Sequence, residues 1–433
     1  MKKSLKIVFF ICLVIGIAAA ALNLYAGSQS GVLAEIEAQQ AACKQALAKI
    51  EAADILGIDP ATVVVPDEVV ISGMDKFIMG VNSSSAMLWV VAIDALIIGV
   101  GGFVYSAYKQ KKKAQQGVKK LGSSSSVVGI LIALAALCLD LAIASPVFFT
   151  ASNFLNVFQQ ISINFVVAVG MTFVIISGGI DLSVGSNIAL SGLLMGILMK
   201  NFGVPVPVTI LACILFSGLI GLVNGMLISF LNLPPFIATL GMMSIVRGAA
   251  YTVTGGQPIY TFPPGFTAIA SRVGGFPLYT MLILAAVFFL GWYILRYTRV
   301  GRFTYAIGGN ENCAKLSGIN LKKVKCFVYV VSGLCCGVAA LLLSSRLDSA
   351  VPTNAEGQEM DAIAAVVIGG TSMSGGEGSM IGTLIGILII GIISNGLNLL
   401  GVAQGPQKMV KGLIIVIAVI IDVIRRKASE SAK

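Results

Sequence analysis

The chain has 433 residues, of which 57% are hydrophobic and 11% charged, and its formal net charge is +10. Soluble globular proteins carry roughly 25% charged residues, so this composition excludes that class and indicates a protein whose main solvent is lipid. Histidine is absent, which excludes histidine-based catalytic triads, zinc sites and proton relays. The eight cysteines show no Cys-x-x-Cys spacing, so we interpret them as small packing residues rather than disulfide or metal partners.

The first 125 residues form a region of their own. The apolar run in residues 1–26 begins with three lysines. We interpret it as an uncleaved membrane anchor, with a cleaved signal peptide as the alternative. Residues 27–85 hold eight acidic residues and three lysines, which indicates a small acidic domain outside the cytoplasm. A second apolar run, 86–107, leads into residues 108–125, whose six lysines and lack of acids indicate a cytoplasmic linker by the positive-inside rule.

Residues 126–427 predict a polytopic bundle of about ten helices, because a helix needs roughly 20 apolar residues to cross a bilayer. The predicted crossings are residues 127–148, 155–177, 184–201, 206–230, 235–252, 277–297, 326–346, 360–370, 380–401 and 407–424. The crossing at 360–370 is short, so a half-span is the alternative there, and the turn at 178–184 is the second doubtful place. Counting all ten from a cytoplasmic linker puts the basic loop 296–325, the tail 428–433 and both termini in the cytoplasm.

Two glycine pairs followed by similar residues indicate an internal repeat, with chance similarity of glycine- and serine-rich segments as the alternative. Gly178-Gly179 precedes Leu182-Ser183-Val184-Gly185, and Gly369-Gly370 precedes Met373-Ser374-Gly375-Gly376. The two turns supply the candidate gating residues Gly178, Gly179, Asp181, Asp361, Gly369 and Gly370. We interpret the glycines spaced along the other spans as places where helix backbones approach closely.

Ionisable residues within membrane spans are costly and therefore functional suspects. They are Asp94, Asp140, Asp181, Arg247, Asp361 and Glu377. We expect Arg247 to pair with one of these acids and Asp181 to cap a helix that opens at Leu182, with direct substrate contact as the alternative. The acids do not form the dense array that a proton- or sodium-driven pump needs.

The basic loop is the most informative polar segment. Because the chain has no Gly-Lys dipeptide, it has no P-loop, so ATP and its Mg²⁺ are expected on another subunit, and we expect no cofactor or metal in this chain. Within residues 296–325, a short helix-forming stretch lies between Gly308-Gly309 and Gly318. Such a helix has the form of a docking knob for a groove on a partner, an ordinary connector being the alternative.

Several long stretches form a specific pattern between about residues 126 and 427. They are Ala168–Thr172 with Ser177–Ser186, Pro235–Gly241, Thr298–Arg302, Ala306–Asn310 with Leu316–Asn320, and Met360–Ser372. Together they resemble the permease subunits of ATP-binding-cassette (ABC) importers for ribose, galactose, xylose and similar monosaccharides. The resemblance leaves residues 1–125 as additions, which we expect to contact the binding protein or a neighbouring envelope component.

The resemblance implies an all-α, vitamin-B12-importer-like permease core that forms a homodimeric pore in the bacterial inner membrane. It implies two partners, a cytoplasmic ATPase with two nucleotide-binding halves and an extracytoplasmic sugar-binding protein, and no nucleic acid. It assigns ATPase docking to Gly309, Asn310, Glu311, Ala314, Leu316 and Gly318. In the family the loop usually reads Glu-Ala-Ala before Leu-Ser-Gly, whereas this chain has Glu311-Asn312-Cys313 and keeps the glutamate and its spacing to Gly318.

We therefore expect a transport subunit, not an enzyme, that moves a monosaccharide by alternating access while its partner hydrolyses ATP. A sugar in transit needs hydrogen-bonding groups without tight binding, and the candidates are uncharged polar residues within spans, each of which could equally bridge two helices. They are Asn164, Thr172, Asn187, Asn224, Thr239, Asn395 and Asn398. The alternatives are a nucleoside permease of the same superfamily, an ion-coupled sugar carrier and a membrane scaffold.

Overall fold

The computed structural model describes residues 134, 138, 141–142, 145 and 147–430. The predicted anchor, acidic domain, second span and basic linker lie outside these residues, as do most of the crossing at 127–148 and the acids Asp94 and Asp140. The chain divides into two compact units. The larger comprises Gly99–Gly396 with Gln407–Lys433, and the smaller comprises Met1–Ile98 with Leu397–Pro406.

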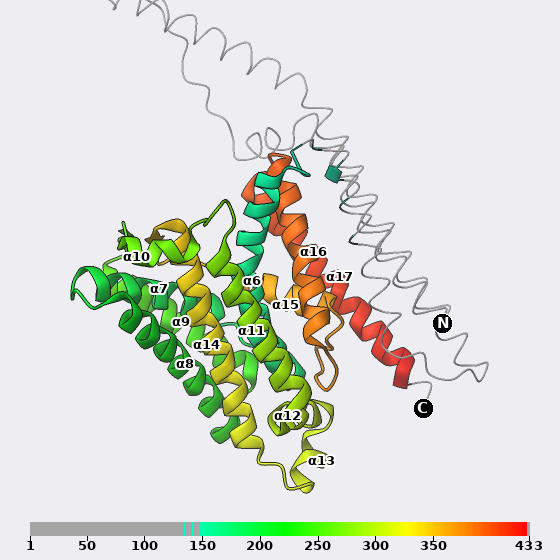
Figure 1. The fold of residues 1–433 in the computed structure, drawn as a ribbon. Coiled ribbons are helices and arrows are strands. Elements are labelled where there is room, and N and C mark those ends of the chain that lie inside the picture. The colour runs from blue at the N-terminus through cyan, green and yellow to red at the C-terminus, as the bar shows by residue number, and fades with distance from the viewer. Residues whose placement is uncertain (1–133, 135–137, 139–140, 143–144, 146, 431–433) are drawn as a thin grey trace, which may run out of the picture. The chain divides into compact units, whose positions relative to one another are not determined.

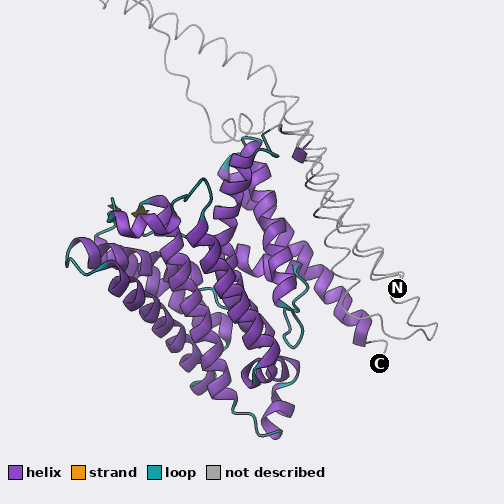
Figure 2. Cartoon of the chain, in the orientation of Figure 1, coloured by secondary structure: helices purple, strands orange, loops and turns teal. Residues whose placement is uncertain are grey.

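The described chain is almost entirely helical (Figures 1 and 2). Its helices are α6 (Ala151–Ile176), α7 (Val184–Lys200), α8 (Val206–Phe230), α9 (Pro235–Thr254), α10 (Pro264–Thr267), the 3-10 helix η2 (Ala268–Ala270), α11 (Leu278–Tyr297), α12 (Arg299–Gly309), α13 (Glu311–Leu316), α14 (Leu321–Leu347), α15 (Gln358–Ile368), α16 (Met380–Leu399) and α17 (Gln404–Glu430). Among the described residues, six helices are long and apolar enough to cross a membrane: α6, α8, α9, α11, α14 and α16. The prediction of a polytopic helical membrane protein is therefore confirmed, and α8 has the predicted bounds, 206–230.

The described part of the smaller unit is the turn that joins α16 to α17. Gly401 takes a positive φ of +69° there. The Val402 N–H donates to the Leu397 carbonyl over 3.0 Å, which closes the turn.

Helix α6 forms the centre of the larger unit. Its second half is buried continuously from Phe165 to Ile176, and it packs against α11, α14 and α15. At its start, the Thr150 hydroxyl accepts the Asn153 N–H over 3.3 Å, a side-chain cap that satisfies one of the free N–H groups of the first turn. The core therefore lies where α6 and α7 meet α14.

Helices α8 and α14 are in contact backbone to backbone through glycines. A Cβ atom at Gly225 would lie 2.7 Å from the Cys326 Cα, and one at Gly337 would lie 2.7 Å from the Ile214 Cα. Real Cβ contacts are essentially never shorter than 3.0 Å, so no larger residue fits at either position. The predicted role of these spaced glycines as close-packing sites is confirmed for this helix pair.

Helix α15 is too short for a full crossing. It has 11 residues, which at 1.5 Å per residue gives about 17 Å, against about 30 Å for the bilayer core. The predicted crossing at 360–370 is therefore not one complete helix, which agrees with the half-span alternative. The chain continues after α15 as a loop that reaches Gly308-Gly309 of α12 through Gly375-Gly376. Helix α7 has 17 residues and begins at Val184, the predicted first residue of the crossing at 184–201, and not at Leu182, where the capping prediction had it open.

A two-stranded sheet and nearby polar contacts connect the α9–α11 segment with the end of α14, at the end of the larger unit opposite α12 and α13 (Figure 1). Strand β1 (Ile259–Tyr260) pairs antiparallel with β2 (Ser349–Ala350). The Asp348 carboxylate accepts the Phe262 N–H over 2.7 Å, and the Ser345 hydroxyl accepts the Ala270 N–H over 3.0 Å. The segment between α9 and α11 is thereby fixed to the end of α14.

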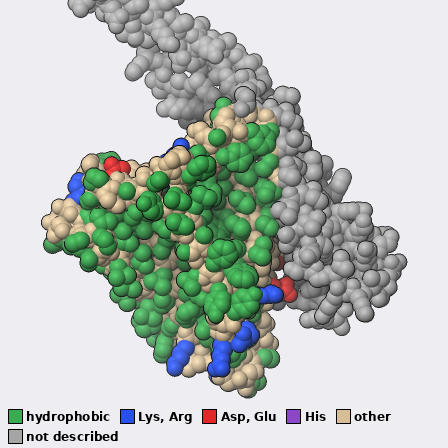
Figure 3. All heavy atoms as spheres, viewed as in Figure 1, with side chains coloured by type: hydrophobic (Ala, Val, Ile, Leu, Met, Phe, Trp, Pro, Cys, Tyr) green, Lys and Arg blue, Asp and Glu red, His purple; other side chains and the backbone are tan. Residues whose placement is uncertain are grey.

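The outer faces of α8, α9 and α11 carry exposed apolar side chains in the described part of the chain. Figure 3 shows a largely hydrophobic surface on the side of the larger unit where these helices lie in Figure 1. Leu219, Ile245 and Phe289 are each more than half exposed there. Such a continuous apolar face is expected to meet lipid or another membrane helix, because water contact would be unfavourable.

Candidate functional site

The predicted docking helix is present as α13, which projects beyond the ends of the neighbouring helices (Figure 1). Its inner side packs on an apolar cluster formed by Ala314, Ile307 and Val324, with Phe303, Ile319 and Leu321 around it. Because this cluster joins α12, α13 and the start of α14, the short helix is held against its neighbours rather than standing free.

Both ends of α13 are capped by hydrogen bonds to its backbone groups. At the start, the Asn310 side chain accepts the Cys313 N–H over 2.9 Å, a helix N-cap. At the end, the Ile319 N–H donates to the Ala314 carbonyl and the Gly318 N–H to the Lys315 carbonyl, the two bonds of a Schellman motif. Gly318 has φ +80°, the left-handed conformation that this motif requires and that glycine adopts without strain.

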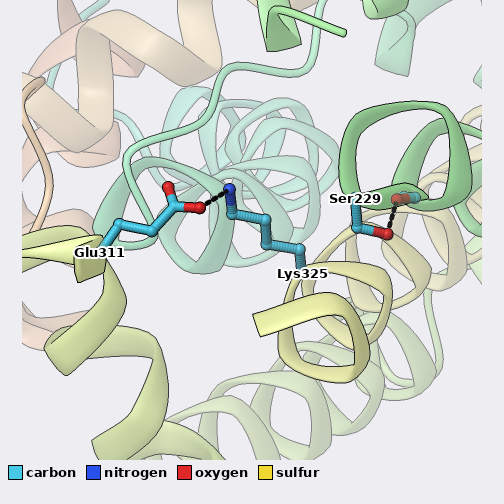
Figure 4. A network of polar contacts seen from close by, with 4 residues as sticks. Ser229, Glu311 and Lys325 are labelled. Atoms are coloured by element: carbon cyan, nitrogen blue, oxygen red, sulfur yellow. Dashed lines mark hydrogen bonds and ion pairs between the residues drawn. The ribbon is translucent and has the colours of Figure 1, made fainter. Parts of the chain in front are cut away.

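An ion pair adds a third restraint on α13. Lys325, on the first turns of α14, donates to a carboxylate oxygen of Glu311 over 2.8 Å (Figure 4). The Glu311 side chain is 51% exposed, and such surface pairs contribute only about 0.2–1 kcal/mol. The pair therefore fixes the orientation of α13 more than it adds to stability, and it occupies the glutamate that the sequence singled out.

The outer side of α13 presents one apolar residue among basic ones. Leu316 is 88% exposed, the most exposed of the large apolar side chains described. Lysine and arginine side chains gather at this end of the larger unit (Figure 3); in sequence they are Arg296, Arg299, Arg302, Lys315, Lys322, Lys323 and Lys325. An exposed leucine on a preorganised helix is typical of a docking contact, in which a partner protein buries the apolar side chain.

The two glycine turns are alike in part. Each follows a helix end, α6 at Ile176 and α15 at Ile368. Each contains one glycine with a positive φ, +82° at Gly178 and +89° at Gly370, but these two occupy different places within their glycine pairs. After the first turn a helix begins within a few residues, whereas the chain after the second stays non-helical until Met380.

Asp181 is buried in the first turn among hydroxyl groups. Its carboxylate accepts the Ser183 N–H (3.0 Å), the Ser183 hydroxyl (2.7 Å) and, from the middle of α14, the Ser332 hydroxyl (2.8 Å). The N-cap of α7 is Ser183, and no side chain caps this helix, so the prediction that Asp181 caps it is wrong. Asp181 instead closes the turn before Ser183 and joins that turn to α14, a role that was not predicted.

Arg247 pairs with none of the described acids, so the predicted ion pair with Asp181, Asp361 or Glu377 is wrong; Asp94 and Asp140 lie outside the described residues. Its guanidinium donates to the backbone carbonyls of Pro352 and Asn354, because the segment after β2 turns its carbonyl oxygens toward α9. Asp361 instead pairs with Lys411 of α17 over 2.7 Å. Glu377 is exposed.

The uncharged candidates for the substrate path take several positions. Thr172 contacts Thr383 of α16, and Asn395 exchanges two amide hydrogen bonds with Asn153 of α6. The remaining candidates are Asn187, which bonds Ser217 of α8; Asn224, which donates to the Ser183 hydroxyl; Thr239, which bonds the Pro235 carbonyl; Asn164, whose buried Oδ1 has no partner among the described residues; and Asn398, which is exposed. Thr239 also donates to the Ile180 carbonyl over 3.3 Å. Five of the candidates, Thr172, Asn187, Asn224, Thr239 and Asn395, therefore join separate segments of one chain.

Sequence reasoning missed three polar residues that hold the candidate site together: Lys325, Ser332 and Lys411. Lys325 carried a usable signal, because it lies in the same basic loop as Glu311, the loop's only acid. Ser332 and Lys411 carried none, since each meets its partner across at least 50 residues of sequence.

Comparisons with known proteins agree with this architecture. Residues 153–419 match the family described as branched-chain amino acid transport system / permease component. The ribose import permease protein of Escherichia coli (strain K12) is 45% identical over 299 residues, covering 67% of this chain and 92% of that protein. The corresponding protein of Bacillus subtilis (strain 168) is 44% identical over 312 residues, covering 70% and 94%.

A galactose/methyl galactoside import permease protein of Haemophilus influenzae is 37% identical over 295 residues, covering 64% of this chain and 88% of that protein. No solved structure matches the chain significantly. Since the family match covers more than half of the chain and these relatives are matched over most of their length, the chain belongs to the family of branched-chain amino acid transport system permease components.

Proposed function

We propose that this chain is the pore subunit of an ATP-driven importer that moves a monosaccharide into the cytoplasm by alternating access. The substrate class is ribose, galactose/glucose or xylose, with ribose first because the relatives at 44–45% identity are named ribose import permeases. The sugar arrives on an extracytoplasmic binding protein, and a separate ATPase with two nucleotide-binding halves supplies the energy. The chain itself catalyses no bond chemistry.

The observation that carries this proposal is the preorganised helix α13 with Leu316 exposed at its tip. A helix already capped, paired and packed loses little conformational freedom on binding, so its apolar tip contributes most of its burial energy to the complex. Two copies of the chain supply two such helices, one for each half of the ATPase. The apolar outer faces of α8, α9 and α11 leave surface for lipid and for the second copy.

The orientation follows from charge. Basic residues concentrate at the α12–α13 end of the larger unit, which the positive-inside rule assigns to the cytoplasm. The same rule supports cytoplasmic N- and C-termini in a multi-pass inner-membrane protein. The β1–β2 end then faces the binding protein, and residues 27–85, on the same side, supply an additional contact for it.

The proposed core has about ten helices between residues 126 and 427, preceded by a two-helix unit, and its sugar path is lined by uncharged polar groups. Among the seven candidates, Asn164 and Asn224 have the strongest claim, because the buried Oδ1 of each has no partner within the described residues. Two functional suspects, the Asp181 and Asp361 turns, act in gating rather than in sugar contact, since their carboxylates already accept hydrogen bonds from this chain.

The test reconstitutes the chain with an ABC ATPase that has two nucleotide-binding halves and with a sugar-binding protein. Uptake of ribose into proteoliposomes should require all three components and internal ATP. Burying a leucine side chain contributes about 1.5–3 kcal/mol, so Leu316→Asp should weaken ATPase binding roughly 10- to 100-fold, whereas Leu316→Met, which stays apolar, should bind nearly as wild type. Full ATPase binding by Leu316→Asp would refute docking at α13.

Two rival functions are separated in the same vesicles. A nucleoside permease would transport nucleosides, and not sugars, with the same ATP requirement. An ion-coupled carrier would accumulate sugar with the purified chain alone and an ion gradient. Unchanged uptake and binding-protein affinity after deletion of residues 27–85 would remove the proposed role of that domain and leave the importer itself untouched.

A further inference from the structure

Three backbone segments meet next to α13 with no side chain between them. They are the end of α6 (Ile176–Gly178), the last turn of α12 (Gly308-Gly309) and the loop before α16 (Gly375-Gly376), which we call the glycine junction. The Gly376 N–H donates to the Ile176 carbonyl over 2.9 Å. A Cβ at Gly375 would lie 2.9 Å from both the Gly178 nitrogen and the Gly308 Cα. All three segments are therefore in direct backbone contact.

Glycine is required at this junction by space. A Cβ at Gly308 would overlap the Ile176 carbonyl and lie 2.5 Å from the Gly376 nitrogen. A Cβ at Gly376 would lie 2.7 Å from the Gly309 Cα. Because the opposing atoms belong to the backbone, they cannot rotate away, so even one methyl group separates the segments.

The junction connects α13 to distant parts of the fold. Gly309 is followed by Asn310, the N-cap of α13, with no intervening linker. On the other sides, Ile176 leads into the Asp181 turn, and the loop before α16 bonds α17 where Asp422 accepts the Met373 N–H over 3.1 Å. Packed protein interiors are nearly incompressible, so a displacement at one of these segments is passed on to the others.

A side chain reinforces the same contact. The Tyr305 hydroxyl of α12 donates to the Gly378 carbonyl over 2.9 Å. Burial raises the pKa of Tyr305, with the Arg296 charge opposing the effect, so the hydroxyl keeps its proton near neutral pH and remains a donor. Helix α12 is thus attached to this loop by its backbone at Gly308 and by a side chain one turn earlier.

We propose that the glycine junction transmits the displacement of α13 to both glycine turns, with Gly308, Gly376 and Tyr305 as positioning residues for coupling. The inference rests on the proposed docking of an ATPase at α13. It adds that one backbone contact carries the motion to the α6–α7 turn and to the loop before α16 together. The two turns that resemble each other in sequence then respond to a single input.

The test measures coupling in the reconstituted importer with Gly308→Ala. We expect ATPase binding and ATP hydrolysis without binding protein to stay within twofold of wild type, while ribose uptake per ATP falls about tenfold or more, since small misplacements alone can cost that much. The matched control is Gly412→Ala in α17, where a Cβ would meet no described atom within 4 Å and uptake should be unchanged. Galactose or xylose replaces ribose in this assay if the wild-type chain transports one of them better.

The outcomes separate the two proposals. If wild-type chain does not bind the ATPase, the proposed function fails. If it does, and Gly308→Ala transports with the same uptake per ATP as Gly412→Ala, the junction proposal is overturned. Should Gly308→Ala not fold, Tyr305→Phe replaces it, because removing one hydroxyl creates no overlap. Reduced uptake per ATP with an unchanged melting temperature would support the junction, and full coupling would overturn it.

Discussion

Removing either partner of the Asp361–Lys411 pair should destabilise the larger unit, and the two removals should differ. The Asp361 side chain is 9% exposed and that of Lys411 26%. Breaking a buried ion pair from one side costs about 3–5 kcal/mol. Lys411→Gln leaves the more buried group, the Asp361 carboxylate, without its cation. Asp361 lies in the first turn of α15, whose N-terminal end offsets about 0.3–1 kcal/mol of this cost. We therefore expect the free energy of unfolding to fall by about 3 kcal/mol in Lys411→Gln and by about half of that in Asp361→Asn.

The double variant sharpens the prediction. Asp361→Asn with Lys411→Gln leaves two amides that can bond each other and no uncompensated charge. Its cost should be smaller than the sum of the single costs by about 2 kcal/mol, the coupling expected for residues in contact. The pair joins α15 to α17, so the loss of either partner weakens the attachment of this short helix to α17.

A thiol-reactive dye measures the effect, because Cys335 and Cys336 are buried in α14 and become reactive on unfolding. At roughly 2 °C per kcal/mol, Lys411→Gln should lower the melting temperature by about 6 °C. Lys408→Gln, an exposed position on the same helix, is the matched control and should shift it by about 1 °C or less. Equal melting temperatures for the two glutamine variants, or strictly additive single costs, would refute the reasoning.

Three further changes test other contacts. Gly225→Val should abolish most folded protein, measured by size-exclusion chromatography of a fluorescent fusion, because its side chain would overlap the Cys326 backbone. Asn395→Ala strands a buried amide of Asn153 and should cost about 1–3 kcal/mol in a melting experiment, while the double alanine variant should cost no more than the single one. Gly318→Ala should cost about 1 kcal/mol for its positive φ and lower ATPase co-purification, whereas normal co-purification would argue that the turn does not orient α13.

The helices were predictable where an apolar run ends at a residue that stops helices. Pro205 precedes α8 directly, and the apolar run ends near Phe230, so both bounds follow from local sequence. Helix α13 was predictable for the same reason, since glycines flank a helix-forming stretch. The length of α15 was ambiguous, because the apolar run continues into Gly369-Gly370 and sequence alone does not show where the helix stops.

The polar contacts were much less predictable, because they form between distant segments. Arg247 was expected to find an acid, but the segment after β2 offers two carbonyl oxygens, and no residue type reveals which way a backbone carbonyl will point. Lys411 meets Asp361 from 50 residues away. The glycine junction was hidden likewise: the glycines of the turns and of the loop were noted separately, and only the fold brings them together.

The backbone contact between α8 and α14 restricts how this subunit can move. Neither helix can slide or rotate against the other while their backbones are in contact at the glycines. We therefore expect α8 and α14 to move as one rigid body. Spin labels at Leu219 on α8 and Lys323 on α14, both exposed, should therefore report one distance in every state of the transport cycle. The distance between these two labels can then serve as a constant reference when label distances to α9, α11 or α13 are compared between states.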